Sequence, residues 1–184
     1  MQSVVEVAML RSELNDIPHH ELNRDYCFKF YENGDAKTWA MVQTQAESYH
    51  QEMTADFHSK EFEDDFERLK AKQIFVESVT SGEIVATATA WRGELDGFTM
   101  GRIHWVAVIP SHQRKGLARA MCTKLLTIFK EKGYQQVFLT TENFRIDAIN
   151  IYLKFGFKKY IRHETEIEIW QEIEEKLNLK HEIF

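Results

Sequence analysis

Residues Ile103–Leu126 read IHWVAVIPSHQRKGLARAMCTKLL, and this stretch decides the fold of the chain. It opens with a β-rich run that must leave the sheet at Pro110, because proline has no N–H for a central ladder. From Leu117 onward the apolar residues recur at helical spacing, which predicts a helix. A short basic loop that ends at Gly116 joins the two. The stretch therefore predicts a strand, a turn and a helix.

The turn between this strand and this helix is a candidate phosphate-binding site. A helix N-terminus presents unpaired N–H groups and a partial positive charge, and both suit a phosphate. Gly116 has no side chain to keep an anion from the backbone, and Arg114 and Lys115 add positive charge. An ordinary strand-to-helix connection with solvated charges explains the same residues, so the turn alone leaves both interpretations open.

Two motifs resemble those of the GNAT superfamily of N-acetyltransferases. Gln113-x-x-Gly116-x-Ala118 is similar to the family's acetyl-CoA signature, which is usually Gln/Arg-x-x-Gly-x-Gly/Ala. Residues 148–157, AINIYLKFGF, are similar to its second landmark, Ala-Ile-x-Leu-Tyr-x-Lys-x-Gly-Phe. The two motifs occur in the family's order, with a strand predicted at Gln136–Thr140 between them. The resemblance covers about residues 73–161 well, and both ends of the chain fit it loosely.

The resemblance implies an α+β fold with a mixed, mostly antiparallel central sheet that is flanked by helices and splayed at the acetyl-CoA site. The periodicity of the sequence agrees with it, and hairpin turns are expected at Ser81-Gly82 and Asp96-Gly97. Besides the motif strand, strands are predicted at 3–10, 26–31, 73–79, 84–91, 136–140 and 157–162. Besides the motif helix, helices are predicted at 36–51, 54–72, 147–155 and 165–179.

The C-terminal segment departs from the family pattern, in which one further antiparallel strand is expected. Thr165-Glu166-Ile167-Glu168 has the form of a capping box, and the apolar residues from Ile167 to Leu177 keep helical spacing. We therefore predict a helix over Thr165–Leu179, with a final strand as the competing interpretation.

Composition narrows the classes of function. The 184 residues, 43 % of them hydrophobic, fit a single GNAT-like domain over residues 1–184. The net charge of −6 without a Lys/Arg cluster disfavours nucleic acid as a partner. No apolar run approaches the roughly 20 residues that span a bilayer, and the N-terminus does not resemble a secretory signal, so no membrane partner is expected.

Cysteine usage indicates a reducing compartment. Cys27 and Cys122 are too few and too far apart for a disulfide framework or a zinc site, so we expect a cytoplasmic protein without a metal. Cys122 lies on the predicted buried face of the motif helix, which favours an inert core thiol. His19-His20-Glu21 is interpreted as part of a solvated loop.

The resemblance assigns the co-substrate acetyl-CoA to particular residues. In the family the pantetheine arm bonds to the backbone of the motif strand as a substitute strand, and this role falls here to Val106, Ala107 and Val108. Arg145 stands where many relatives carry an asparagine that contacts the cofactor, so Asn143 is considered as a substitute. The residues expected to wrap the pyrophosphate, mainly through N–H groups, are Gln113, Arg114, Lys115, Gly116, Leu117 and Ala118.

The reaction implied by the resemblance is attack of a neutral amine on the acetyl thioester. Neither motif carries a cysteine that suggests a covalent intermediate, so direct attack in a ternary complex is expected. Tyr152 matches the family tyrosine that commonly protonates the departing thiolate. Its alternative is a core tyrosine, because it shares a helix face with Ile149 and Phe155.

The base is less determined by the sequence. An amine with a pKa near 10.4 is mostly protonated at neutral pH and must lose a proton. Some relatives place a glutamate where this chain has Thr140, and others use a histidine that corresponds to His104. Strand alternation predicts that Arg102, His104 and Val106 share a face. A structural role for His104, Glu142 as the base and a relay through water all stay open.

The sequence therefore predicts an acetyl-CoA-dependent N-acetyltransferase whose acceptor is an amine of a small molecule or a peptide. A non-catalytic acyl-CoA-binding module is the alternative, since it would keep Gly116 without a working base. A P-loop fails, because Lys115 precedes the glycine. The acidic residues of Glu61–Glu67 are interpreted as a solvated helix face. The sequence leaves the acceptor undetermined and a homodimer open.

Overall fold

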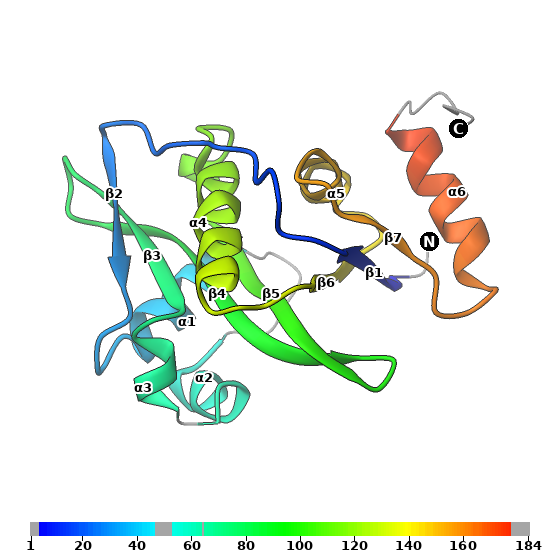
Figure 1. Cartoon of the computed structure of the whole chain (residues 1–184). Coiled ribbons are helices and arrows are strands. Elements are labelled where there is room, and N and C mark those ends of the chain that lie inside the picture. The colour runs from blue at the N-terminus through cyan, green and yellow to red at the C-terminus, as the bar shows by residue number, and fades with distance from the viewer. Residues whose placement is uncertain (1–3, 47–52, 64, 178–184) are drawn as a thin grey trace.

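A computed structural model describes residues 4–46, 53–63 and 65–177, and a seven-stranded sheet in the order β2-β3-β4-β5-β6-β1-β7 organises them (Figure 1). The strands are β1 (Glu6–Arg11), β2 (Tyr26–Phe30), β3 (Gln73–Ser78), β4 (Ile84–Leu95), β5 (Phe98–Val108), β6 (Val137–Glu142) and β7 (Lys158–Tyr160). The helices are α1 (Ala36–Ala46), α2 (Ala55–Glu61), α3 (Phe66–Leu69), α4 (Leu117–Glu131), α5 (Ile146–Lys154) and α6 (Glu166–Lys176).

The sheet is splayed between β5 and β6. These two strands form the parallel pair, and their pairing is confined to Gly101 with Val137 and Arg102 with Phe138. Every other neighbouring pair is antiparallel. Beyond Arg102, β5 continues to Val108 beside β4, while β6 continues beside β1. The structure thus confirms a mixed, mostly antiparallel sheet that opens after Arg102.

Helices cover both faces of the sheet because successive strand residues point to opposite sides. Ile74 of β3 belongs to the large core cluster that contains the buried face of α4. Its neighbour Phe75 belongs to an aromatic cluster with Trp39 of α1 and Phe62, which follows α2. Strand β5 therefore lies between two packed layers, and both layers fix its position.

The prediction of one helix over residues 54–72 is wrong. α2 begins after Thr54, whose hydroxyl accepts the Phe57 N–H at 3.1 Å, and α3 begins after Asp65, which caps the Arg68 N–H at 3.0 Å. Between the two helices Glu63 has a φ of 56°, a left-handed conformation that no continuous helix contains. The break lets both short helices pack against the sheet.

The C-terminal prediction is correct for the helix and wrong for its cap. Helix α6 extends from Glu166 to Lys176, and the end of the predicted range, at 178–179, lies outside the described residues. Thr165 precedes the helix but makes no side-chain capping bond. Instead the Glu166 carboxylate accepts the backbone N–H and the Nε–H of Arg162, at 3.0 and 2.9 Å.

The remaining predicted elements are present, with shifted ends. The predicted strand at 84–91 extends to Leu95, and the predicted helix at 36–51 is described as far as Ala46; residues 47–51 lie outside the described part. The N-terminal strand pairs with both β6 and β7, which places it inside the sheet. No helix within the described ranges is long and apolar enough to cross a membrane.

Candidate active site

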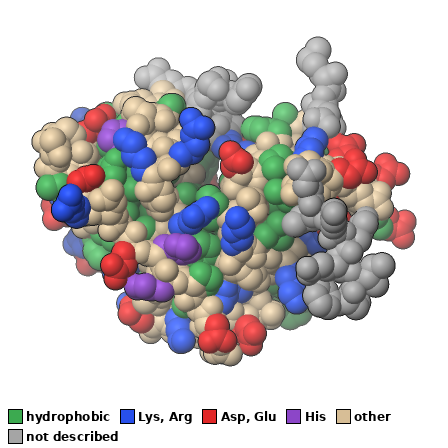
Figure 2. Space-filling model, turned by 90° about the horizontal axis from the view of Figure 1, so that it is seen from above, with side chains coloured by type: hydrophobic (Ala, Val, Ile, Leu, Met, Phe, Trp, Pro, Cys, Tyr) green, Lys and Arg blue, Asp and Glu red, His purple; other side chains and the backbone are tan. Residues whose placement is uncertain are grey.

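The splay opens a cleft of about 950 Å³ between β5, the start of α4, the end of β6 and α5. Residues of the two motifs, which are 30 or more positions apart in the sequence, meet in this cleft. The predicted site residues that line it are His104, Val106, Ala107, Val108, Gln113, Arg114, Gly116, Leu117, Ala118 and Tyr152. Lys115 and Asn143 are not among its lining residues. On the face in Figure 2, the coloured acidic and basic side chains are interspersed.

A bulge in β5 shapes one wall of the cleft. Trp105 has a φ of 52°, and three residue steps on β5, from His104 to Ala107, oppose two on β4, from Thr89 to Thr87. The expected shared face is therefore correct for Arg102 and His104 and wrong for Val106. Val106 packs against the large core cluster, whereas the His104 ring contacts Phe62.

A buried glutamine supports this bulge. Gln43 of α1, which is 3 % exposed, donates from Nε2 to the Trp105 carbonyl at 2.9 Å. The Trp105 ring packs edge-on against Trp39 of the same helix, with the ring centroids 5.3 Å apart. Helix α1 therefore fixes both the backbone and the side chain of the residue that follows His104.

The strand-to-helix turn has the backbone of an anion site. Gly116 precedes α4 with a φ of 83°, and Arg114 has a φ of 59°. A Cβ at Gly116 would meet no atom within 4 Å, so in this structure the backbone conformation, and not crowding, favours glycine. The first helical bond runs from the Ala120 N–H to Gly116, which leaves the preceding N–H groups available to a ligand. Gln113 donates from Nε2 to the Val108 carbonyl at 3.1 Å.

His104 is held by the carboxylate of Glu61, a residue that was predicted to lie on a solvated helix face. Nε2 of His104 lies 2.6 Å from Oε1 of Glu61, and Nε1 of Trp105 donates to the same oxygen at 3.2 Å. Both partners come from β5, while Glu61 ends α2. The interpretation of Glu61 as a solvated residue is wrong, and no local pattern connects positions that are 43 residues apart.

The electrostatics of this pair favour a neutral imidazole beside an ionised carboxylate. Burial lowers the pKa of His104 and outweighs the attraction of Glu61, which raises it. The hydrogen bond from His104 lowers the pKa of Glu61. An ionised carboxylate only accepts, so Nε2 carries the proton and donates it to Glu61. Nδ1 is then the basic nitrogen of the ring.

Tyr152 lines the cleft from α5 with a protonated phenol. It is 7 % exposed, and its ring packs against Phe157 with the centroids 5.9 Å apart. Burial raises the pKa of Tyr152, so the phenol keeps its proton at neutral pH. The neighbouring Cys122 is buried as expected, and burial raises the pKa of its thiol to about 12, which makes it unreactive.

The other candidate residues have partners within the protein. The backbone N–H of Asn143 donates to the Val5 carbonyl at 2.9 Å, and its Oδ1 accepts the Val5 N–H at 3.2 Å. These bonds tie Asn143 to the chain that enters β1. Glu142 lines the cleft and forms an ion pair with Arg145. Among the described residues, no group of three or more His, Cys, Asp or Glu side chains could hold a metal ion.

Comparison with known proteins agrees with this geometry. A family model described as the acetyltransferase (GNAT) family matches residues 36–157. The chain is 33 % identical over 76 residues to a mycothiol acetyltransferase of Amycolatopsis mediterranei, which is 41 % of this chain and 24 % of that protein. It is also 33 % identical over 54 residues to human N-acetyltransferase 8B, which is 29 % of this chain and 24 % of that protein. The chain thus matches about a quarter of the length of these relatives.

The fold also matches that of a solved structure. The crystal structure of a GCN5-related N-acetyltransferase from Sphaerobacter thermophilus superimposes with a TM-score of 0.66. The superposition covers 84 % of this chain and 48 % of that chain, at 19 % sequence identity. At this identity the similarity concerns the fold.

Proposed function

Because the chain belongs to the acetyltransferase (GNAT) family, we propose that it is an acetyl-CoA-dependent N-acetyltransferase. The observation that supports this most is the cleft itself, which has an anion-binding turn at one end and a buried histidine and tyrosine along its walls. A binding module needs the turn alone. A base held neutral and an acid held protonated are the two groups that acetyl transfer to an amine requires.

The cleft fits an extended thioester of coenzyme A. β5 has no β6 partner beyond Arg102, so the backbone at Val106, Ala107 and Val108 borders the cleft without a neighbouring strand on that side. The free N–H groups at the start of α4 would bind the pyrophosphate, with Arg114 and Arg119 adding positive charge. When bound, acetyl-CoA supplies an activated acetyl group at the inner part of the cleft.

The residues of the chain then move two protons. His104 accepts a proton at Nδ1 from the amine as its nitrogen bonds to the acetyl carbon, and Glu61 holds the imidazole in place. Tyr152 donates its phenolic proton to the sulfur as the carbon–sulfur bond breaks. His104 then loses its proton to solvent and Tyr152 regains one from it, so both groups return to their starting protonation states. The amine attacks directly in a ternary complex, because the thiol of Cys122 is protonated and inert.

A screen of amines tests the proposal. Small-molecule amines and peptides with free N-termini or lysines are incubated with acetyl-CoA and the wild-type protein, and release of the free CoA thiol is measured. We expect acetyl-CoA to raise the melting temperature and at least one class of amine to be acetylated. A protein that binds acetyl-CoA and turns over no amine would be a non-catalytic binder, and a protein that does not bind it would contradict the proposal.

A further inference from the structure

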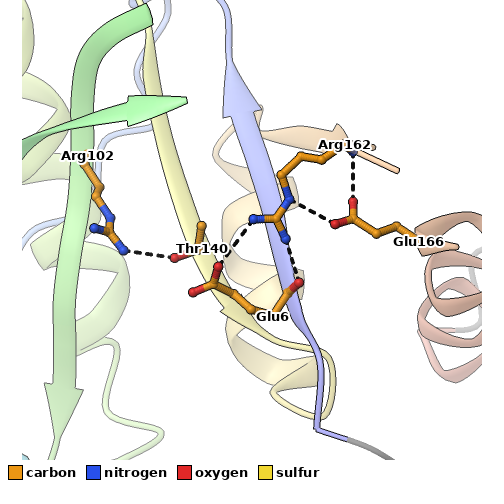
Figure 3. A network of polar contacts seen from close by, with 5 residues as sticks. All are labelled: Glu6, Arg102, Thr140, Arg162 and Glu166. Carbon is orange, nitrogen blue, oxygen red and sulfur yellow. Dashed lines mark hydrogen bonds and ion pairs between the residues drawn. The ribbon is translucent and has the colours of Figure 1, made fainter. Parts of the chain in front are cut away.

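Arg102 is a partly buried cation in the cleft, and it forms no ion pair with any carboxylate in the described part of the chain. It lines the cleft from β5, at the last residue that pairs with β6. Its Nη2 donates to Oγ1 of Thr140 at 3.1 Å, across the point where the strands separate (Figure 3). No carboxylate among the described residues forms an ion pair with it, and its Nε has no hydrogen-bond partner there.

The two acidic residues whose charges act on Arg102, Glu6 and Glu61, have other partners. Glu6, which also lines the cleft, forms an ion pair with Arg162 at 3.4 Å, and Figure 3 shows its carboxylate between Thr140 and Arg162. Glu61 accepts from His104 and Trp105. Burial lowers the pKa of Arg102 more than the attraction of Glu6 and Glu61 raises it, so the charge is incompletely compensated. Arg102 thus lines the cleft with a partly desolvated charge and a buried Nε that has no hydrogen-bond partner among the described residues, and such a group favours an anionic ligand.

The position of Arg102 separates it from the cofactor phosphates. Val108 lies six residue steps beyond Arg102 on β5, which is about 20 Å of strand, and the anion-binding turn follows Val108. If the pantetheine arm binds along Val106–Val108, as the resemblance to the family implies, its acetyl end would lie near His104, with Arg102 beyond it. Arg102 is therefore on the acceptor side of the reacting atoms.

We propose that the acceptor carries a carboxylate close to its amine, as in an α-amino acid or a similarly compact amino acid, and that Arg102 binds this carboxylate. This inference rests on the proposed N-acetyltransferase function. Arg102 and His104 are two residues apart on one face of β5, so their Cα atoms are only about 7 Å apart. A single guanidinium matches a single carboxylate, whereas a doubly charged phosphate would call for more than one cation.

The test compares matched acceptors. α-Amino acids are supplied as free acids and as their primary carboxamides, with O-phosphoethanolamine as the phosphate counterpart, and kcat/KM is measured from CoA release. The α-amine of a carboxamide has a lower pKa than the α-amine of the free acid, so more of it is neutral at pH 7. Without a contribution from Arg102, the carboxamides should therefore be the better acceptors. We expect the wild type to prefer the acid by about 30-fold or more, with the difference mainly in KM.

Two variants test whether Arg102 causes the preference for acids over carboxamides. Arg102→Gln removes the charge and keeps a polar amide side chain, and we expect kcat/KM to fall roughly 30- to 1000-fold for the acids and to stay within about 3-fold for the carboxamides. The matched control is Arg92→Gln, an exposed arginine of β4 that bonds to Glu63 at 2.7 Å and does not line the cleft. Its acid preference should equal that of the wild type.

Each outcome decides the inference. Equal use of acids and carboxamides by the wild type, or a preference for O-phosphoethanolamine, would overturn the carboxylate site while leaving the N-acetyltransferase intact. An acid preference that survives in Arg102→Gln would overturn the role of Arg102. If Arg102→Gln does not fold, the wild-type comparison decides alone. If acetyl-CoA binds but no amine is acetylated, the proposed function fails and this inference fails with it.

Discussion

Glu61 fixes the chemical state of His104 from a neighbouring helix. Its carboxylate oxygen accepts from both His104 and Trp105, so two hydrogen bonds hold the carboxylate while one of them orients the imidazole. Removing its charge would lower the pKa of His104 further, because Glu61 is the main group that raises it. Glu61 does not line the cleft and acts through His104, which makes it a positioning residue.

Glu61→Gln tests this positioning. We expect kcat/KM to fall by up to about 100-fold, less than the loss of a proton-transfer group itself, and the acidic limb of its pH profile to move to lower pH. Glu63→Gln is the matched control, since Glu63 lies two residues away, exposed and paired with Arg92. An unchanged pH profile in Glu61→Gln would remove the link between the carboxylate and the base.

At the scale of single residues, the sequence predicted the parts of the site that belong to motifs. Gly116 and Tyr152 each belong to a short motif that is recognised by the spacing of its residues, and both line the cleft. Glu61 could not be found in this way, because its contact depends on the helix break after it and on the bulge at Trp105. Arg102 was placed on the correct face, but the absence of an ion pair to it among the described residues is a property of the folded cleft.

The conformation of the turn before α4 depends on Gly116. Its φ of 83° favours glycine, and the space around it is open. We expect Gly116→Ala to lower the free energy of unfolding by about 1 kcal/mol through the left-handed backbone and to keep acetyl-CoA binding. Gly116→Glu should have a similar stability cost and should abolish the acetyl-CoA-dependent rise in melting temperature. A folded Gly116→Glu variant with an undiminished rise would contradict the phosphate-binding role of the turn.

Asn143 joins the end of β6 to the segment that enters β1. Its two bonds with Val5 favour a structural role over the cofactor contact considered from the sequence. We expect Asn143→Ala to lower the free energy of unfolding by about 1 kcal/mol, because the Val5 N–H loses its partner, and to leave the acetyl-CoA dissociation constant within about 2-fold. Chemical unfolding measures the free energy of unfolding, and titration calorimetry measures the acetyl-CoA dissociation constant. A large loss of affinity with unchanged stability would favour the cofactor role.

At the scale of elements, the sequence predicted most helices and strands from their periodicity. Failures occurred where tertiary packing overrides local preference. The apolar stripe of residues 54–72 is compatible with one helix, yet the left-handed Glu63 divides it so that Phe62 and Leu69 can both be buried. The position of β1 between β6 and β7 depends on pairing partners that no local pattern specifies.

At the scale of the whole molecule, the buried pair of His104 and Glu61 links stability to pH. The pKa of His104 is lowered in the folded state, so below about pH 6.5 the unfolded chain binds a proton that the folded one does not. The lowered pKa of Glu61 acts in the same direction at lower pH. Stability should therefore decrease as the pH falls from 7 towards 5, by at most about 1.4 kcal/mol per pH unit from His104.

His104→Gln separates this contribution from other acid effects. The variant cannot titrate at this position, so its melting temperature should depend less on pH between 5 and 7 than that of the wild type. His19→Gln is the control, because His19 is exposed. Equal pH dependence in His104→Gln and the wild type would show that the histidine is not buried in its neutral form.

The proposed cleft carries out acetyl transfer in addition to binding acetyl-CoA, and Tyr152→Phe distinguishes transfer from binding. The substitution removes the phenolic oxygen and keeps the ring against Phe157. An interaction made mainly in the transition state appears in turnover and not in cofactor affinity.

The decisive measurement is therefore kcat together with the acetyl-CoA dissociation constant for Tyr152→Phe and the wild type, with the best acceptor from the amine screen. For Tyr152→Phe we expect an unchanged acetyl-CoA dissociation constant, an unchanged melting temperature and a kcat reduced roughly 10²- to 10⁴-fold. A folded Tyr152→Phe variant that matches the wild type in both affinity and kcat would contradict this expectation.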